Sequence, residues 1–449
     1  MKTIEQLPRG GSAVRWALGL AATVLLAAGM AAAGDGDEAG SSIRVGLLPD
    51  VGESPRMVTV VANSARRAML RNADLIANLV NGLPDSTRFL VLTNDRAAFV
   101  VTGREQPERV RFLELPFTSP LTIWPQDPFL VLTDGDETIL LTSRKFERAD
   151  DRLMAPAIAA DRGYRLATSA LSFEGGNIVA DQERVFIGAN TIRRNAIELG
   201  VGEVEVVLRF ETELGRPVTV VGPTPQPVAH LDMMLTPLGD GRLAVADTGA
   251  GADLAERALV DDPDQARSFE SWCENHFFGR PAIRELDGLD GPIRAPELEG
   301  GTARMIDSSR RIAPVLDGIA SSLIGAGYRV ERVPLLDGGT IRGEHAAFEM
   351  RPTMRAAYPI LTYNNVLLAD TNGRRSVYLP RYGFDPLDRA AEQTWRSMGF
   401  EVHAIEGLAI SAMYGGALRC TVKVLERSSL PRGEPLPLEP AADAPHLEY

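Results

Sequence analysis

Two kinds of apolar pattern alternate along the chain. Short apolar runs rich in β-branched and aromatic side chains predict strands, as in RFLVLT (88–93) and VRFLELP (110–116). Longer stretches with apolar residues three and four positions apart predict helices, the first of them over residues 57–80, after a strand at 43–49. This alternation of strands and helices predicts an α/β fold.

From residue 124 the alternation repeats in units. Each unit begins with two apolar runs separated by a turn, and a helix and a further strand follow. In the first unit, PFLVLT (128–133) and ETILLT (137–142) flank the turn, and a helix lies near 153–161. Further units begin near residues 173, 230 and 363. A fifth begins at 415 but has too few residues left for a helix.

A polar motif stands at the start of each unit. The five motifs are WPQD (124–127), FEGGN (173–177), HLD (230–232), YNN (363–365) and GGALRC (415–420). Units that begin alike and stack around an axis place their first residues together at one end of that axis. The repeat therefore predicts one central site that contains Asp127, Glu174, His230, Asp232, Asn364 and Cys420.

The third unit is longer than the others. Asp127 and Glu174 are 47 residues apart, and the pairs Glu174/His230 and Asn364/Cys420 are each 56 apart, whereas His230 and Asn364 are separated by 134. We interpret the glycine-, proline- and acid-rich segment at about 249–303 as an insertion. The strand, helix and strand at 43–93 would complete the fifth unit and close a ring without a free sheet edge.

The two ends of the chain differ from the repeat. The first 33 residues carry Lys2, Arg9 and Arg15, an apolar run at 16–30 and three alanines, which together predict a secretory signal peptide. We therefore expect export to a periplasm or the medium, with an uncleaved membrane anchor as the alternative. The proline- and acid-rich tail at 428–449 is expected to be disordered.

The net charge indicates which classes of partner to expect, and the cysteines raise the question of a disulfide. The chain has a formal net charge of −13, which disfavours nucleic acid and favours cationic small molecules or basic peptides. Its two cysteines are Cys273, in a predicted helical insertion, and Cys420, at the entrance of the predicted strand TVKVL (421–425). An exported protein can join two cysteines in a disulfide, but their different settings favour a free thiol at Cys420.

A thiol, an imidazole and several carboxylates in one cavity suit a substrate that is a delocalised cation. Two carboxylates can hold a planar guanidinium by charge-assisted hydrogen bonds, and we assign this role to Asp127 and Asp232. Cys420 would attack the guanidinium carbon, and His230 would protonate the departing ammonia and then activate water. Glu174 would contact the substrate or orient His230. This chemistry requires neither a metal nor an organic cofactor.

In order along the chain, the five motifs resemble the site motifs of the guanidino-group modifying superfamily, also called penteins. This superfamily includes arginine, agmatine and protein-arginine deiminases, dimethylarginine hydrolases and amidinotransferases. The resemblance covers residues 110–427 and implies a five-bladed pseudosymmetric α/β propeller, with a single catalytic domain over 43–427. It also implies that Cys420 is the nucleophile, that His230 is the general acid and base, and that Asp127 and Asp232 hold the guanidinium.

The motifs give divided signals about the substrate. WPQD, which begins at Trp124 and has a glutamine before its aspartate, resembles protein-arginine deiminases. Arg144, in TSRKF after the first strand pair, falls where those enzymes have an arginine that contacts the substrate backbone. Export also favours a polymeric substrate. YNN, with Asn364, resembles agmatine deiminases, and GGALRC resembles free-arginine deiminases.

We therefore expect a hydrolase that converts peptidyl-arginine to citrulline and ammonia. The alternative substrate is agmatine or free arginine. The non-enzymatic alternative is an inactive, secreted binding propeller, against which the joint presence of the cysteine, the histidine and both aspartates argues.

Overall fold

The computed structural model describes residues 45–62, 73–94, 108–116, 121–148, 150–273, 301–338, 359–408, 411–412 and 415–428. All of them belong to the unit Ala39–Tyr449. The predicted signal peptide, the tail beyond residue 428 and residues 274–300 of the predicted insertion lie outside the described ranges. Among the helices described, none combines the length and the apolar character that crossing a membrane requires.

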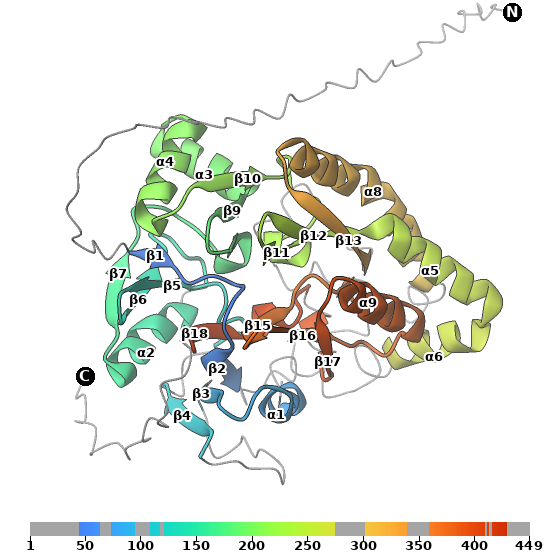
Figure 1. The fold of residues 1–449 in the computed structure, drawn as a ribbon, viewed down its shortest axis with the longest axis horizontal. Helices are drawn as coiled ribbons and strands as arrows, with labels where there is room; N and C mark the ends of the chain where they lie inside the picture. Colours follow the sequence, from blue (N-terminus) through green and yellow to red (C-terminus); the bar gives the residue numbers. More distant parts are fainter. Residues whose placement is uncertain are drawn as a thin grey trace, which may run out of the picture. The chain divides into compact units, whose positions relative to one another are not determined.

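The described strands form five sheets of three or four strands (Figure 1). In order of pairing, the first sheet is β1 (Gly46–Leu47), β5 (Phe129–Asp134), β6 (Glu137–Thr142) and β7 (Arg165–Thr168), and the second is β10 (Val218–Val221), β9 (Val185–Gly188) and β8 (Ile178–Ala180). The third is β11 (Leu235–Gly239), β12 (Arg242–Asp247), β13 (Arg329–Leu336) and β14 (Leu361–Thr362). The fourth is β15 (Leu367–Thr371), β16 (Arg374–Pro380) and β17 (Glu401–Ile405), and the fifth is β18 (Lys423–Arg427), β2 (Pro55–Ala62), β3 (Arg88–Thr93) and β4 (Val110–Glu114).

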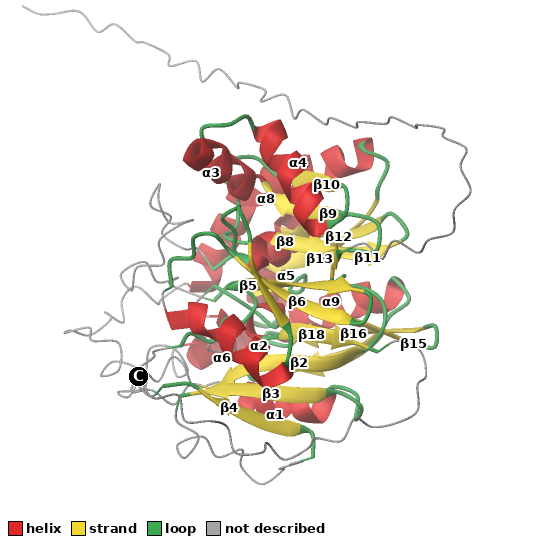
Figure 2. Ribbon diagram, turned by 90° about the vertical axis from the view of Figure 1, so that its left-hand side faces the viewer, coloured by secondary structure: helices red, strands yellow, loops and turns green. Residues whose placement is uncertain are grey.

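Every sheet contains the same three-strand arrangement. An antiparallel pair is followed by a strand that runs parallel to the second member of the pair, as in β5, β6 and β7 or in β11, β12 and β13. The N-terminal strands complete the fifth unit, because β18 pairs antiparallel with β2 and β2 pairs parallel with β3 (Figure 2). The fold is therefore α/β with mixed sheets, and its closure into a five-bladed ring stays a prediction.

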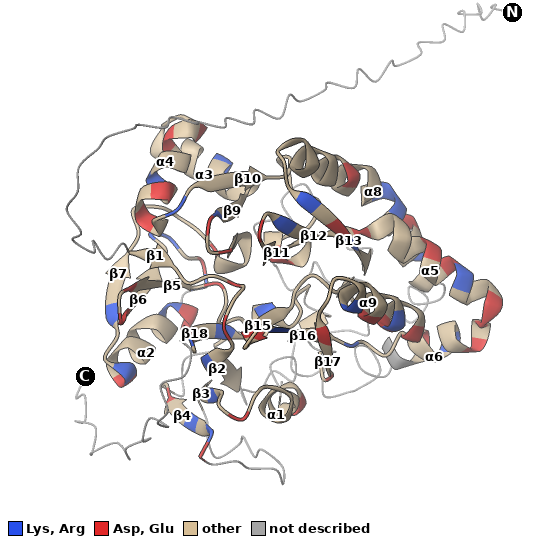
Figure 3. Ribbon diagram, viewed as in Figure 1, with Lys and Arg blue, Asp and Glu red and all other residues tan. Residues whose placement is uncertain are grey.

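Most helices lie outside the strands in the view of Figure 1. They are α1 (Ala73–Gly82), α2 (Met154–Arg162), α3 (Ala189–Leu199), α4 (Glu203–Leu214), α5 (Thr248–Asp261), α6 (Pro263–Cys273), α8 (Gly301–Gly325) and α9 (Asp385–Ser397). In α9, Leu387, Ala391 and Trp395 are four residues apart and all fully buried, which is the pattern of a helix that packs one face on a sheet. Residues of both charge signs are interspersed along α5 and α8 (Figure 3), as expected for solvated helix faces.

Single helical turns include the last residues of three polar motifs and lead into the strands that follow. They are η4 (Gly175–Asn177), η5 (Leu231–Met233) and η8 (Arg419–Thr421), and a further turn, η3 (Asp150–Leu153), precedes α2. Asp127 likewise comes directly before β5, and Asn364 before β15. Each predicted motif thus stands at the entrance of the first strand of its sheet, as the repeat predicts.

Three elements differ from the prediction. The helix expected over 57–80 is wrong at its start, because Pro55–Ala62 forms β2, which lies between β18 and β3. A strand covered on both faces has a continuous apolar sequence, which periodicity cannot distinguish from a buried helix. The second unit has two helices, α3 and α4, where one was expected in each unit. Residues 249–273 of the predicted insertion form α5 and α6, and Ala252, Ala255 and Phe269 are buried in the core, so this part belongs to the third unit.

Candidate functional site

The structure brings five of the predicted site residues together. The Nε2 atom of His230 lies 2.7 Å from Oε2 of Glu174, and its Nδ1 atom lies 3.7 Å from Oδ1 of Asp127. The Sγ atom of Cys420 lies 3.9 Å from Oδ2 of Asp232. These residues come from four different motifs, so the site depends on the packing of several sheets rather than on any local segment.

Cys420 occupies the η8 turn and is almost fully buried, with 3% of its surface exposed. Its thiol is free, so the disulfide to Cys273 considered above is not present. The amide of Asn365 holds it at two points: Nδ2 donates to Sγ at 3.2 Å, and Oδ1 accepts from the backbone N–H of Cys420 at 3.1 Å. Burial, and then the carboxylate of Asp232, raise the pKa of Cys420 to about 11. Without a cationic ligand, the sulfur is therefore a neutral thiol near neutral pH.

His230 precedes the η5 turn, with its imidazole between two carboxylates. Burial alone would lower the pKa of His230, but Asp127, the Cys420 thiol and Glu174 together raise it well above its ordinary value. Burial acts to raise the pKa of Glu174, but the hydrogen bond with His230 and its charge lower that pKa to about 2. The pair is thus an imidazolium held by a carboxylate, which is the protonation state of a general acid.

The two glycines of FEGGN make room for this arrangement. A Cβ atom on Gly175 would lie 2.0 Å from the backbone oxygen of Gln126, and one on Gly176 would lie 2.3 Å from Nδ1 of His230. Real Cβ atoms do not approach other atoms so closely, so any side chain here would push the WPQD loop or the imidazole away. The close packing of the site thus requires glycine at both positions.

Asp232 is held from one side only. Its Oδ2 atom accepts from Nη1 of Arg419 at 2.8 Å, and Arg419 also donates through Nε to Oδ1 of Asp50 at 2.8 Å. Oδ1 of Asp232 is buried and has no hydrogen-bond partner among the described residues. Burial raises the pKa of Asp232, against the effect of Arg419. An unpartnered buried carboxylate oxygen near a thiol can accept a hydrogen bond from a cationic substrate.

Asp127 already has an internal cationic partner. Its Oδ2 atom accepts from Nη2 of Arg148 at 2.6 Å, and its Oδ1 atom accepts from the N–H of Gly176 at 3.2 Å. Arg148 also pairs through Nε with Oδ2 of Asp151 at 3.0 Å. Although burial opposes the charge, these two aspartates raise the pKa of Arg148. A substrate guanidinium must therefore share Asp127 with Arg148 or displace it.

The remaining predicted residues have other contacts. Trp124 is buried beside Cys420 in one apolar cluster, where its ring fills the space that a Cβ on Gly416 would take. Asn364, expected at the substrate, donates instead to the backbone oxygen of Ala244 at 3.0 Å. The two asparagines of YNN are neighbours in a bend between β14 and β15, and their side chains have different partners. The motif was therefore located correctly, but Asn365 is the residue that contacts the sulfur.

Arg144 lies in a cluster of charges beside Glu174. Its Nη2 atom donates to Oε2 of Glu198 at 2.9 Å, and 39% of the Arg144 side chain is exposed. Lys145 and Arg194 pair with the same carboxylate at 3.6 and 4.0 Å, and the charge of Arg194 contributes to the lowered pKa of Glu174. The cluster thus combines three cations with one acid.

Sequence reasoning missed Asn365, Arg148 and Asp50 as members of the site. Asn365 is part of the predicted motif YNN, and Arg148 lies four residues after the predicted site residue Arg144. Both could have been found by considering the neighbours of the predicted residues. Asp50 follows the first predicted strand and is 369 residues from Arg419 in sequence, so no local pattern connects them. Among the described residues, no group of three or more histidine, cysteine and acidic side chains is arranged to hold a metal ion.

No family model matches the sequence, and no curated protein does so. The structure, however, is similar to solved agmatine deiminases. The agmatine deiminase of Enterococcus faecalis matches with a TM-score of 0.56 and 12% identity, over 87% of this chain and 99% of that chain. A cysteine-to-serine variant of the C. jejuni agmatine deiminase with substrate bound matches with a TM-score of 0.55 and 10% identity, over 85% of this chain and 97% of that one. The chain therefore has the fold of these guanidino-group modifying enzymes.

Proposed function

We propose that this chain, which has the fold of the agmatine deiminases, is itself a guanidine C–N hydrolase with Cys420 as its nucleophile. The observation that carries the proposal is the convergence of a buried free thiol, an imidazole between two carboxylates, and the unpartnered oxygen of Asp232. A planar cation bound at Asp232 would place its central carbon near Sγ. In this proposal the five sheets are the blades of one pseudosymmetric ring, with the motifs at its axis.

The reaction would begin with loss of the Cys420 proton to solvent water, because His230 is already protonated. A bound guanidinium supplies positive charge beside the sulfur, which lowers the pKa of the thiol and produces the thiolate that attacks the guanidinium carbon. A new C–S bond forms, and the resulting tetrahedral carbon loses ammonia, for which His230 supplies the proton. The neutral imidazole then takes a proton from water, the hydroxide attacks the same carbon, and the C–S bond breaks to give the ureido product and the thiol.

The charges around the site favour a substrate with oxygen atoms at its far end. Arg144, Lys145 and Arg194 all pair with Glu198, and the charge of Arg194 also acts on Glu174. A carboxylate or a peptide carbonyl can accept hydrogen bonds from exposed guanidinium groups, whereas the primary ammonium of agmatine would be repelled. We therefore propose peptidyl-arginine as the substrate, which agrees with the export expected from the N-terminal sequence.

Agmatine remains the second candidate, and the observation that favours it is the similarity to agmatine deiminases of known structure. Turnover of benzoyl-arginine amide, free arginine and agmatine, measured by a colorimetric ureido assay, would distinguish the two. We expect the highest kcat/KM for benzoyl-arginine amide. A preference for agmatine would contradict the assignment of the substrate, and the absence of turnover with all three would favour the inactive binding protein.

Variants connect the activity to the site. We expect Cys420→Ala and His230→Ala each to abolish ureido formation without loss of the folded state, as judged by circular dichroism. Arg144→Met should raise the KM for benzoyl-arginine amide but not for agmatine. Arg193→Met is the matched control, because Arg193 is 59% exposed and pairs with Glu203 instead of the Glu198 cluster. Unchanged turnover in Cys420→Ala would exclude the mechanism.

A further inference from the structure

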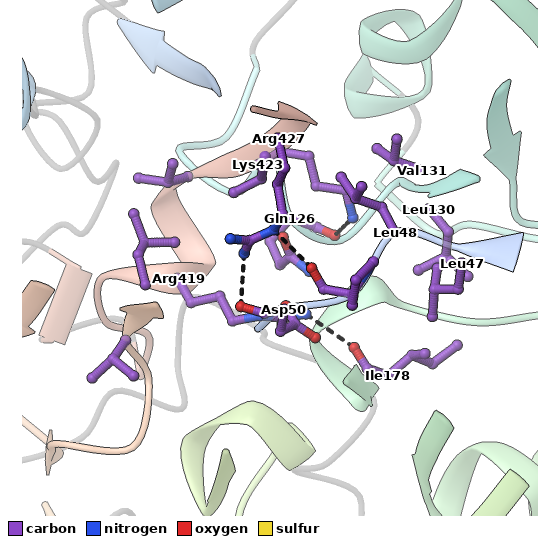
Figure 4. A pocket seen from close by; sticks show the side chains of 15 residues that line it. Leu47, Leu48, Asp50, Gln126, Leu130, Val131, Ile178, Arg419, Lys423 and Arg427 are labelled. Atoms are coloured by element: carbon purple, nitrogen blue, oxygen red, sulfur yellow. Dashed lines mark hydrogen bonds and ion pairs between the residues drawn. The ribbon is translucent and has the colours of Figure 1, made fainter. Parts of the chain in front are cut away.

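A cavity lies next to the candidate site and is lined by Gln126 and Arg419 but not by Cys420 or His230. Figure 4 shows its lining residues. The cavity has a volume of about 40 Å³, and its walls come from β1, β5, β18 and the segments that adjoin them. A water molecule needs about 10–15 Å³ of such space, so the cavity holds only a few particles of that size. Leu47, Leu130 and Val131 form an apolar part of the wall.

The charged side chains of this cavity are unbalanced. Arg419, Lys423 and Arg427 line it, and Asp50 is the one acidic residue among the lining residues described (Figure 4). Asp50 is already engaged, because its Oδ1 atom accepts from Nε of Arg419 and its Oδ2 atom accepts from the N–H of Ala180 at 2.8 Å. The cavity therefore carries an excess of positive charge.

Two of these cations lack an acidic partner. Arg427 uses its guanidinium on four backbone oxygens, two of them those of Pro49 and Asp50, which neutralise no charge. Lys423 is 5% exposed and its Nζ atom donates to the backbone oxygen of Gln126 at 3.2 Å. It forms no ion pair with a carboxylate in the described part of the chain, and two of its three N–H groups remain for a ligand. A buried ammonium without a counter-charge is unfavourable.

We propose that this cavity binds a small inorganic monoanion such as chloride, next to the ammonium group of Lys423. Its volume and its apolar wall suit a small spherical ion that needs few donors, whereas an oxyanion needs several directed ones. The positive charge of Arg427 adds to the attraction without a direct contact. This proposal does not rest on the proposed function, because no residue of the cavity wall has to act on a substrate.

The titration of Lys423 agrees with such a site. Burial, and next the charge of Arg419, lower the pKa of Lys423 to about 7, while Asp50, Asp127 and Asp232 act in the opposite direction. A bound anion favours the protonated amine. Halide binding should therefore weaken as the pH rises above about 7, because the ligand then has to compete with loss of the proton.

The chain suits a direct test because it contains only three lysines, Lys2, Lys145 and Lys423. Thermal unfolding of the whole protein is measured at pH 6.5 while sodium gluconate is exchanged for sodium bromide at constant ionic strength. We expect the unfolding temperature to rise with bromide, and Lys423→Met to weaken the apparent halide affinity about tenfold or more, since a charge-assisted contact is lost. Lys145→Met is the control, because Lys145 is 62% exposed and lies outside the cavity.

Two measurements on the unmodified protein do not depend on the folding of a variant. Amine labelling followed by mass spectrometry should show bromide protecting Lys423 but not Lys145. Crystals grown with bromide should show an anomalous peak within hydrogen-bond distance of the Lys423 Nζ atom. Equal bromide responses of the wild type and Lys423→Met, labelling of Lys423 that bromide does not change, or the absence of a peak in the cavity would each overturn the proposal.

Discussion

Replacing Asp232 with asparagine separates two effects that this carboxylate has on Cys420. Turnover should fall, because the substrate guanidinium loses its partner at the unpartnered Oδ1 atom. The free thiol, by contrast, should become more reactive, because the nearby negative charge that raises its pKa is removed. Loss of turnover combined with a gain of thiol reactivity is not expected from a variant that merely unfolds or distorts the site.

The size of the gain follows from the geometry. At the 3.9 Å between Sγ and Oδ2, two charges interact by about 4 kcal/mol at an effective dielectric constant of about 20, which corresponds to about three pKa units. Arg419, 2.8 Å from the same oxygen, cancels much of this, and we expect a net decrease of about one to two units in the pKa of Cys420. Because a thiolate of lower pKa is intrinsically less nucleophilic, alkylation at pH 8 should accelerate about three- to tenfold.

The assay is the rate of Cys420 alkylation by iodoacetamide between pH 6 and 11, followed by mass spectrometry with substrate absent. In the wild type the rate should rise up to about pH 11, and in Asp232→Asn the whole profile should move to lower pH. Asp240→Asn is the matched control, because Asp240 is exposed, is not among the groups that shift the pKa of Cys420, and has a left-handed backbone conformation that asparagine tolerates. An unchanged profile, or one displaced to higher pH, would refute the electrostatic argument.

Three further variants test other parts of the site. Asn365→Ala should lower kcat about tenfold to a hundredfold with little change in KM, because the sulfur loses its amide donor; a KM effect alone would place Asn365 elsewhere in the reaction. Arg148→Met should reduce the free energy of unfolding by about 3–5 kcal/mol in urea titrations, because two buried aspartates lose their counter-charge. Gly176→Ala should displace His230 and abolish turnover, whereas Gly202→Ala, whose added Cβ meets nothing within 4 Å, should leave kcat unchanged.

Local patterns were sufficient to predict most strands and the position of the motifs. A strand pair with a turn between its members has a short-range signal, and the predicted pair at 128–142 became β5 and β6. Once the repeat was recognised, topology alone placed Asp127, Glu174 and His230 at equivalent strand entrances. The start of the predicted helix at residue 57 was wrong because β2 is covered on both faces and lacks an alternating pattern.

The partners of the site residues could not be predicted in the same way. Arg148 binds Asp127 across the two ends of one strand pair, β5 and β6, where a sequence pattern gives the hairpin but not the side-chain contact. Arg419 joins Asp232 to Asp50 only when separate sheets pack together. Arginines are also numerous in this chain, so an arginine near a motif carries little information by itself. Which of two adjacent asparagines contacts Sγ depends on one peptide orientation, and sequence patterns fix the position of a loop better than the direction of its side chains.

These internal cations change how the site is expected to work. Arg148 and Arg419 already occupy one oxygen each of Asp127 and Asp232, so the two carboxylates are fixed in place before a substrate arrives, and only part of their charge remains available. Asp127 helps to keep His230 cationic, and Cys420 is kept protonated by burial and then by the remaining charge of Asp232. A guanidinium at Asp232 would cancel it and release the thiolate at the moment when the electrophilic carbon is in place. The carboxylate that would hold the substrate therefore also adds to the effect of burial that keeps the nucleophile protonated in the absence of substrate.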